Sequence, residues 1–149
     1  MTTIRVTKKF NWEMSHALYN YNGLCRNLHG HSYKMYATVI GSVSSDEKNP
    51  KWGMVIDFSD FKKIVREEIV DTFDHSVVLC SKENISSIDN IKSLFDRIHI
   101  VDFQPTCENL ATDFAQRIKK LLPKGIELYS LRLYETATSY AEWFAGDQK

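Results

Sequence analysis

The chain has 149 residues, carries no formal net charge at neutral pH, and is 43% hydrophobic and 26% charged. That size and composition predict one globular domain spanning residues 1–149. A neutral chain lacks the basic surface of nucleic-acid-binding proteins, and no apolar run approaches the length of a membrane span. The first residues show no signal-peptide pattern, and three cysteines make no disulfide framework, so we expect a cytoplasmic protein with reduced thiols.

Alternation of apolar and polar residues predicts the strands. In each of the two long strands, one parity is largely apolar, as in a strand with one buried face. His16 ends the apolar face of the first strand, and His29 and His31 lie on one side of the second. The expected strands cover residues 4–16, about 29–40, about 127–136 and 140–144.

Apolar residues at helical spacing predict two helices. The first covers about 60–72 with Ser59 as its N-cap, and the second runs from Thr106, its N-cap, to the stop at Pro123. Between the helices we expect a minor hairpin, made of a short apolar run at 77–79, an irregular polar excursion at 82–96 and a short strand at 97–103.

The order of elements, β-β-α-α-β-β, predicts an α+β fold with two helices on one face of an antiparallel sheet. A single four-stranded sheet would leave its edges unpaired and its other face uncovered. Both problems are solved when subunits join edge to edge, so we expect a symmetric homo-oligomer.

Three histidines predict a metal site. His29 and His31 point to one face of an extended backbone, and His16 ends the neighbouring strand. Three imidazoles suit a zinc ion that keeps its fourth position open. The alternative is a strand entry whose rings make only local hydrogen bonds. Cys25 is either a fourth ligand, an acid–base or nucleophilic thiol, or an inert buried residue. Structural zinc sites usually contain several cysteines, which favours an open site.

Four further polar positions are candidates for the chemistry. Asp74 and His75 follow the first helix and are suited to exchanging a proton with a thiol, although such a pair is often a cap or a surface turn. Glu135 ends an apolar strand face, where a carboxylate needs donors such as two parallel N–H groups of a ligand, unless the strand end reaches solvent. Glu108 lies in the first turn of the second helix, where the helix dipole alone favours a carboxylate.

Six motifs occur in order along nearly the whole chain: Phe10-x5-His16, Cys25-x3-His29-Gly30-His31, Gly53-Met54-Val55-Ile56-Asp57-Phe58, Phe73-Asp74-His75, Pro105-Thr106-x-Glu108-Asn109 and Glu135-Thr136. With these motifs the chain resembles the 6-pyruvoyl-tetrahydropterin synthase family, and within it the bacterial 6-carboxy-tetrahydropterin synthases of queuosine biosynthesis. Each motif is weak alone, but six at compatible distances are specific.

The resemblance implies a role for each matched residue. It makes His16, His29 and His31 the zinc ligands and Cys25 the acid–base residue, with Asp74 and His75 as its relay partners. Glu135 would anchor the pterin ring through its amino group and adjacent ring N–H, and Thr106 and Glu108 would lie at the pterin end of the pocket. The implied fold is the tunnelling fold, in which subunits join their sheets into a barrel, commonly as trimers stacked into a homohexamer with sites between subunits.

The implied reaction is that of a zinc-dependent lyase. 7,8-Dihydroneopterin triphosphate would become 6-carboxy-5,6,7,8-tetrahydropterin, with release of acetaldehyde and triphosphate. The three residues between Cys25 and His29 resemble the 6-carboxy enzymes, because the pyruvoyl enzymes typically have a longer gap. The alternatives are a 6-pyruvoyl synthase, which eliminates triphosphate without carbon–carbon cleavage, a non-catalytic pterin- or purine-binding module, and a structural zinc domain.

Overall fold

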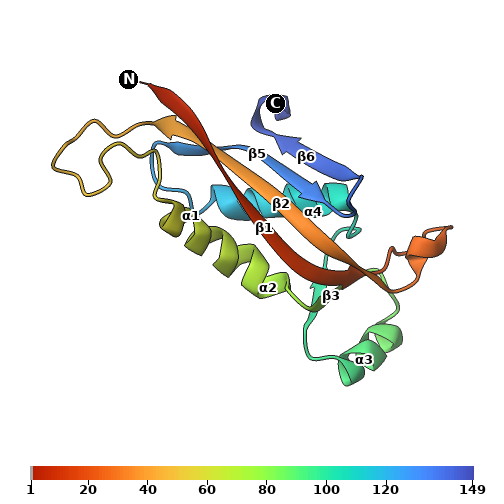
Figure 1. Ribbon diagram of the computed structural model, residues 1–149. Helices are drawn as coiled ribbons and strands as arrows, with labels where there is room; N and C mark the ends of the chain where they lie inside the picture. The colour runs from red at the N-terminus through yellow and green to blue at the C-terminus, as the bar shows by residue number, and fades with distance from the viewer. Residues whose placement is uncertain (1) are drawn as a thin grey trace.

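The computed structural model describes residues 2–149 and shows two long strands at the centre of one curved sheet (Figure 1). Apolar alternation in both strands lets them pair along their whole length with one face buried. Strand β1 and strand β2 are antiparallel, and their register runs from Thr3 opposite Ser42 to His16 opposite His29. The six strands lie in the order β4-β3-β1-β2-β5-β6. They are β1 (Thr3–His16), β2 (His29–Ser42), β3 (Ser76–Cys80), β4 (Ile98–Val101), β5 (Ile126–Tyr134) and β6 (Tyr140–Phe144).

The two expected helices pack on the same face of the sheet. The first consists of α1 (Phe58–Val65), a π-helical turn η2 (Arg66–Val70) and α2 (Asp71–Phe73), and the second is α4 (Cys107–Lys119). Figure 1 shows α1, α2 and α4 beneath the crossing strands β1 and β2. Their apolar stripes and the inward side chains of the strands form one core. Its largest members include Tyr33, Met35, Phe61, Phe73, Phe114 and Leu131.

The first helix begins differently from the prediction. Its N-cap is Asp57, whose Oδ1 accepts a hydrogen bond from the Ser59 backbone N–H at 2.7 Å. A carboxylate accepts this bond as well as a hydroxyl does, and Lys51 pairs with the same side chain. The expected cap at Ser59 was therefore two residues late, whereas Thr106 caps α4 as predicted.

The segment between the helices contradicts the expected hairpin. Strands β3 and β4 are parallel to β1, and α3 (Ile85–Leu94) connects them. Parallel neighbours need a crossover connection, and α3 supplies it where an irregular excursion was expected. The side chain of Asn84 caps this helix by accepting from the Ser86 N–H at 2.9 Å. Buried Ile88 and neighbouring Ile91 face the sheet side of α3.

The predicted α+β class is confirmed, but the two short strands expected as a separate hairpin join the main sheet, which is mixed rather than wholly antiparallel. Strands β4 and β6 are the two edges of this sheet within one chain. No helix among residues 2–149 is long and apolar enough to span a bilayer.

Candidate metal centre

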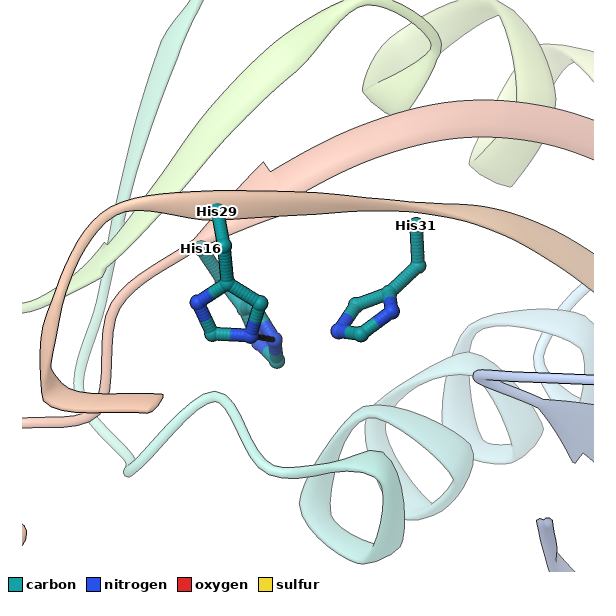
Figure 2. A group of neighbouring side chains, drawn as sticks. All are labelled: His16, His29 and His31. Atoms are coloured by element: carbon teal, nitrogen blue, oxygen red, sulfur yellow. Dashed lines mark hydrogen bonds between the residues drawn. The ribbon is translucent and has the colours of Figure 1, made fainter. Parts of the chain in front are cut away.

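The pairing of β1 with β2 brings three histidines together. His16 is the last residue of β1 and lies directly opposite His29, the first residue of β2, while His31 follows two residues later on the same strand face. One ring nitrogen of each histidine lies within 4.8 Å of the other two. Figure 2 shows the three rings on one side of the two strands, directed toward one another. The structure therefore assembles the three residues that the sequence predicted as metal ligands.

Two backbone carbonyls fix how these rings present their nitrogens. His16 Nδ1 lies 2.7 Å from the Pro105 carbonyl oxygen, and His29 Nδ1 lies 2.7 Å from the Asn27 carbonyl oxygen. A carbonyl oxygen only accepts, so each Nδ1 donates and each neutral ring keeps a lone pair on Nε2. This is the usual support of metal-binding histidines, in which the outer nitrogen donates to a carbonyl.

The inner nitrogens are arranged for a cation. The Nε2 atoms of His16 and His29 face each other at 3.2 Å, the contact dashed in Figure 2. Two lone pairs at that distance repel unless a proton or a metal ion lies between them. His31 Nε2 is also buried and has no hydrogen-bond partner among residues 2–149. The residues present therefore fit a zinc ion that takes three neutral imidazoles.

Burial keeps the ligand set neutral. His16 is only 1% exposed, and this burial lowers its pKa, against the opposing effects of the Pro105 carbonyl and the Glu135 charge. Burial also lowers the pKa of His31. Because a metal ion binds the neutral imidazole, both shifts favour the form that can act as a ligand.

Glu135 approaches two of the same three rings from β5, the strand that pairs with β2 on the side opposite to β1. It follows the last residue of β5, and its Oε1 lies 3.3 Å from His16 Nε2 and 3.6 Å from His31 Nε2. Its side chain is 27% exposed, so the carboxylate lies at the border between the cluster and solvent. The structure thus places Glu135 at the histidine cluster, whereas the sequence pattern indicated a strand end in need of a donor and the family resemblance implied an anchor for the pterin ring.

Sequence reasoning missed Tyr33. It is 1% exposed, and its ring lies 5.7 Å from that of His31 and 6.3 Å from that of His16. Burial, together with the charge of Glu135, raises the pKa of Tyr33, so the phenol stays neutral. Its position was readable from the sequence, because Tyr33 continues the parity of His29 and His31 along β2.

No hydrogen bond among residues 2–149 joins Cys25, Thr106 or Glu108 to the three histidines. Cys25 is exposed in a short 3-10 helix, η1 (Leu24–Arg26), and its carbonyl accepts from the Leu18 N–H at 3.0 Å. The Thr106 hydroxyl accepts from the Asn109 N–H at 3.3 Å as the cap of α4. Glu108 is exposed in the first turn of that helix. Pro105, which precedes Thr106, accepts a hydrogen bond from His16 through its carbonyl oxygen. This contact connects the start of α4 to the histidine cluster.

Asp74 and His75 lie just before β3, beside Glu13 of β1. Asp74 Oδ1 lies 2.9 Å from His75 Nδ1 and also accepts from the Glu13 backbone N–H at 2.9 Å. With Glu13, Ser32 and also His31, His75 lines a shallow depression of about 340 Å³. The ring of His75 is 74% exposed, and no hydrogen bond among residues 2–149 joins this pair to Cys25.

Comparisons with known proteins all lead to one family of pterin synthases. The sequence model of the 6-pyruvoyl tetrahydropterin synthase family matches residues 5–145. The 6-carboxy-5,6,7,8-tetrahydropterin synthase of Haemophilus influenzae is 35% identical over 93% of this chain and 97% of its own length. The 6-pyruvoyl tetrahydrobiopterin synthase of Homo sapiens is 30% identical over 89% of this chain and 85% of its own length.

Solved structures show the same fold at lower identity. An uncharacterized protein from Wolinella succinogenes has a TM-score of 0.79 at 18% identity and covers 97% of this chain and 99% of its own. The 6-pyruvoyl tetrahydropterin synthase of Caenorhabditis elegans has a TM-score of 0.69 at 21% identity, with 97% of each chain covered. The match over residues 5–145 and the relative at 35% identity show that this chain belongs to the 6-pyruvoyl tetrahydropterin synthase family, a family of enzymes.

Proposed function

We propose that this protein is a zinc-dependent lyase that converts 7,8-dihydroneopterin triphosphate to 6-carboxy-5,6,7,8-tetrahydropterin, with release of acetaldehyde and triphosphate. The observation that carries the proposal is the convergence of three imidazole nitrogens on one point, two of them with their lone pairs fixed by backbone carbonyls. Relatives named for the 6-carboxy product, at 30–35% identity over 93% of the chain, support this choice of reaction. The short gap between Cys25 and His29 supports it as well.

Zinc in this centre supplies a Lewis acid that lowers the pKa of the side-chain hydroxyls of the pterin. The protein's own groups then orient the substrate. The Glu135 carboxylate accepts from the pterin amino group and the adjacent ring N–H, a bidentate pairing that fixes the ring plane. Thr106 and Glu108, at the start of α4, border the pterin end of the pocket. Orienting the substrate in this way lowers the activation barrier by roughly several kcal/mol, because the translational and rotational entropy is already lost on binding.

The proton transfers require more than one copy of the chain. Cys25 lies beside the metal ligands in sequence, whereas Asp74 and His75 lie beside Glu13, with the ring of His75 74% exposed and no hydrogen bond to Cys25 among residues 2–149. We propose that the pair serves Cys25 of a neighbouring subunit, and that Asp74 holds the ring as it exchanges protons with the thiol. The edge strands β4 and β6 are open to such an assembly, as a trimer or a hexamer. A cytoplasmic role in queuosine biosynthesis is part of the same proposal.

One incubation tests the reaction. Zinc-loaded protein is mixed with 7,8-dihydroneopterin triphosphate, and the products are identified by mass spectrometry. The proposal predicts a 6-carboxy pterin together with acetaldehyde. The second candidate is the 6-pyruvoyl reaction, favoured by the human relative at 30% identity, and it predicts a pyruvoyl pterin without acetaldehyde. Tight binding of the pterin without any product would instead identify a binding module.

A further inference from the structure

The first of the two long helices ends where several backbone carbonyls have no further helical turn to supply their donors. Helix α2 ends at Phe73, and the next residue, Asp74, has already left the helical conformation at a ψ of 131°. Carbonyls at the end of a helix need donors from elsewhere in the chain. Ser76 Oγ donates to the Phe73 carbonyl at 2.6 Å, which leaves the carbonyls of Asp71, Thr72 and Asp74 to be satisfied.

One side chain, that of Arg97 just before β4, donates to all three of these carbonyls. Its Nε donates to the Asp74 carbonyl at 3.0 Å, and its Nη2 donates to those of Asp71 and Thr72 at 2.8 Å and 3.1 Å. His99 adds a second donor, because its Nε2 lies 2.7 Å from the Thr72 carbonyl. A guanidinium offers a rigid fork of N–H groups, and its charge suits the negative end of a helix. Arg97 therefore closes the end of the first helix.

The turn that Arg97 holds is the one that carries Asp74 and His75. His75 has a φ of +58°, a left-handed conformation that residues other than glycine rarely adopt. Its N–H donates to the Glu13 carbonyl at 2.6 Å, and Asp74 Oδ1 accepts from the Glu13 N–H at 2.9 Å. Such a conformation persists only where the surrounding structure fixes it. Glu13 fixes this turn from β1, and Arg97 fixes it from the side of the helix.

The crossover between β3 and β4 brings Arg97 to this position. Strand β3 begins directly after His75, and β4 pairs with it from Val77 opposite Ile98. The Arg97 carbonyl accepts from the Val77 N–H at 2.9 Å, so the backbone that carries the guanidinium is itself tied to β3. Parallel pairing of this kind needs a crossover, which α3 supplies. The segment thus returns the chain to the turn from which β3 started.

We propose that Arg97 is a positioning residue for the Asp74–His75 pair and that the β3-α3-β4 crossover serves to supply it. This inference rests on the proposed function, in which the pair exchanges protons with Cys25 of a neighbouring subunit. The ring of His75 is 74% exposed, so few contacts of its own hold it in place. Its position depends on the backbone turn beneath it, and Arg97 holds that turn through the carbonyls on the helix side.

A measurement that does not depend on activity tests this role first. The His75 N–H reports the turn, because it donates to the Glu13 carbonyl. In the full zinc-loaded chain, Arg97→Ala is expected to speed amide hydrogen exchange at His75 by about tenfold or more and to leave exchange at Met35, in the centre of β2, unchanged. Lys92→Ala removes an exposed cation from α3 and is the matched control, which should exchange like the wild type. Unchanged exchange at His75 in Arg97→Ala would overturn the inference.

Turnover tests whether the turn matters for the reaction. Arg97→Ala is expected to lower kcat for acetaldehyde release by about 10²-fold, because a proton-transfer group is misplaced. KM should change by less than about twofold, since the groups proposed to bind the pterin lie on other elements. Arg97→Lys keeps the charge without the planar fork, so its kcat should fall between those of Arg97→Ala and the wild type. A loss confined to KM would contradict a positioning role.

A double variant separates positioning from a general loss of structure. If Arg97 acts through His75, Arg97→Ala should cause no further loss of kcat in a chain that already carries His75→Ala. A further loss as large as that in the wild type would overturn the inference. The proposed function fails separately, if the wild type releases no acetaldehyde or if His75→Ala keeps full turnover. Hydrogen exchange at His75 would still decide whether Arg97 holds the turn.

Discussion

The two histidines whose inner nitrogens face each other, His16 and His29, are expected to differ sharply in what they contribute to the stability of the fold. His16 is 1% exposed, and its Nδ1 ties the end of β1 to the Pro105 carbonyl before α4. His29 is more exposed and bonds only to a carbonyl two residues away, that of Asn27. Replacing either by alanine removes one of three imidazoles, so both variants should lose zinc.

In the metal-free protein, only the His16→Ala variant should be clearly less stable than the wild type. His16→Ala leaves the Pro105 carbonyl without its donor, at about 1–3 kcal/mol, and opens a cavity in a closely packed site. We expect the free energy of unfolding of the metal-free protein to fall on the order of 2–4 kcal/mol. His29→Ala should change it by less than about 1 kcal/mol, because its contacts are local and its removal relieves the crowding of lone pairs.

Urea unfolding of both metal-free variants, together with zinc content per chain, measures these effects. Equal stability of the two variants would contradict the position we assign to His16. Retention of zinc with unchanged affinity in His29→Ala would contradict its role as a ligand.

Three further outcomes are expected. Cys25→Ala should keep zinc and pterin binding but lose about 10²-fold or more in turnover, and full activity would remove the thiol from the mechanism. Lys51, followed by the Ser59 N–H, lowers the pKa of Asp57 to about 2 from 3.8. Ionised Asp57 therefore stabilises the folded state above about pH 4, and this stabilisation is lost as the pH falls from about 4 to about 2. Asp57→Asn should make the free energy of unfolding less dependent on pH in that range, as measured by acid unfolding. Ile88→Ala should speed amide hydrogen exchange across α3 and leave zinc affinity unchanged, whereas a weaker zinc affinity would tie α3 to the site.

The clustering of the three histidines was predictable because it depends on local regularities. Alternation set the face of β1 on which His16 lies, and the spacing of His29 and His31 placed both rings on one side of β2. The strands are consecutive in the chain, so antiparallel pairing of their two ends was expected, although residues 17–28 form a long connection between them. The helix start at Thr106 was predictable for the same reason, since a cap depends on residues within one turn.

What the sequence did not reveal depends on long-range pairing. The parallel pairing of β3 with β1 joins Met14 to Ser76 across the chain, and no local pattern distinguishes such a strand from half of a hairpin. The helix α3 carries its apolar residues among many polar ones, so its packing against β3 decides its formation. The approach of Glu135 to the histidines likewise follows from the register of β2 and β5.

The pair Asp74–His75 shows a further limit. Its place after the first helix was correct, but its face of the sheet was not readable, because the chain turns there with His75 at a φ of +58°. The composite site that we propose would give this exposed pair a partner in a neighbouring subunit.

The most direct measurement is the rate of acetaldehyde release as metal-free protein is titrated with zinc. If one ion held by His16, His29 and His31 activates the pterin side chain, the rate rises in proportion to bound zinc and levels off at one ion per chain. Full turnover by the metal-free protein, or a rate indifferent to bound zinc, would contradict the account.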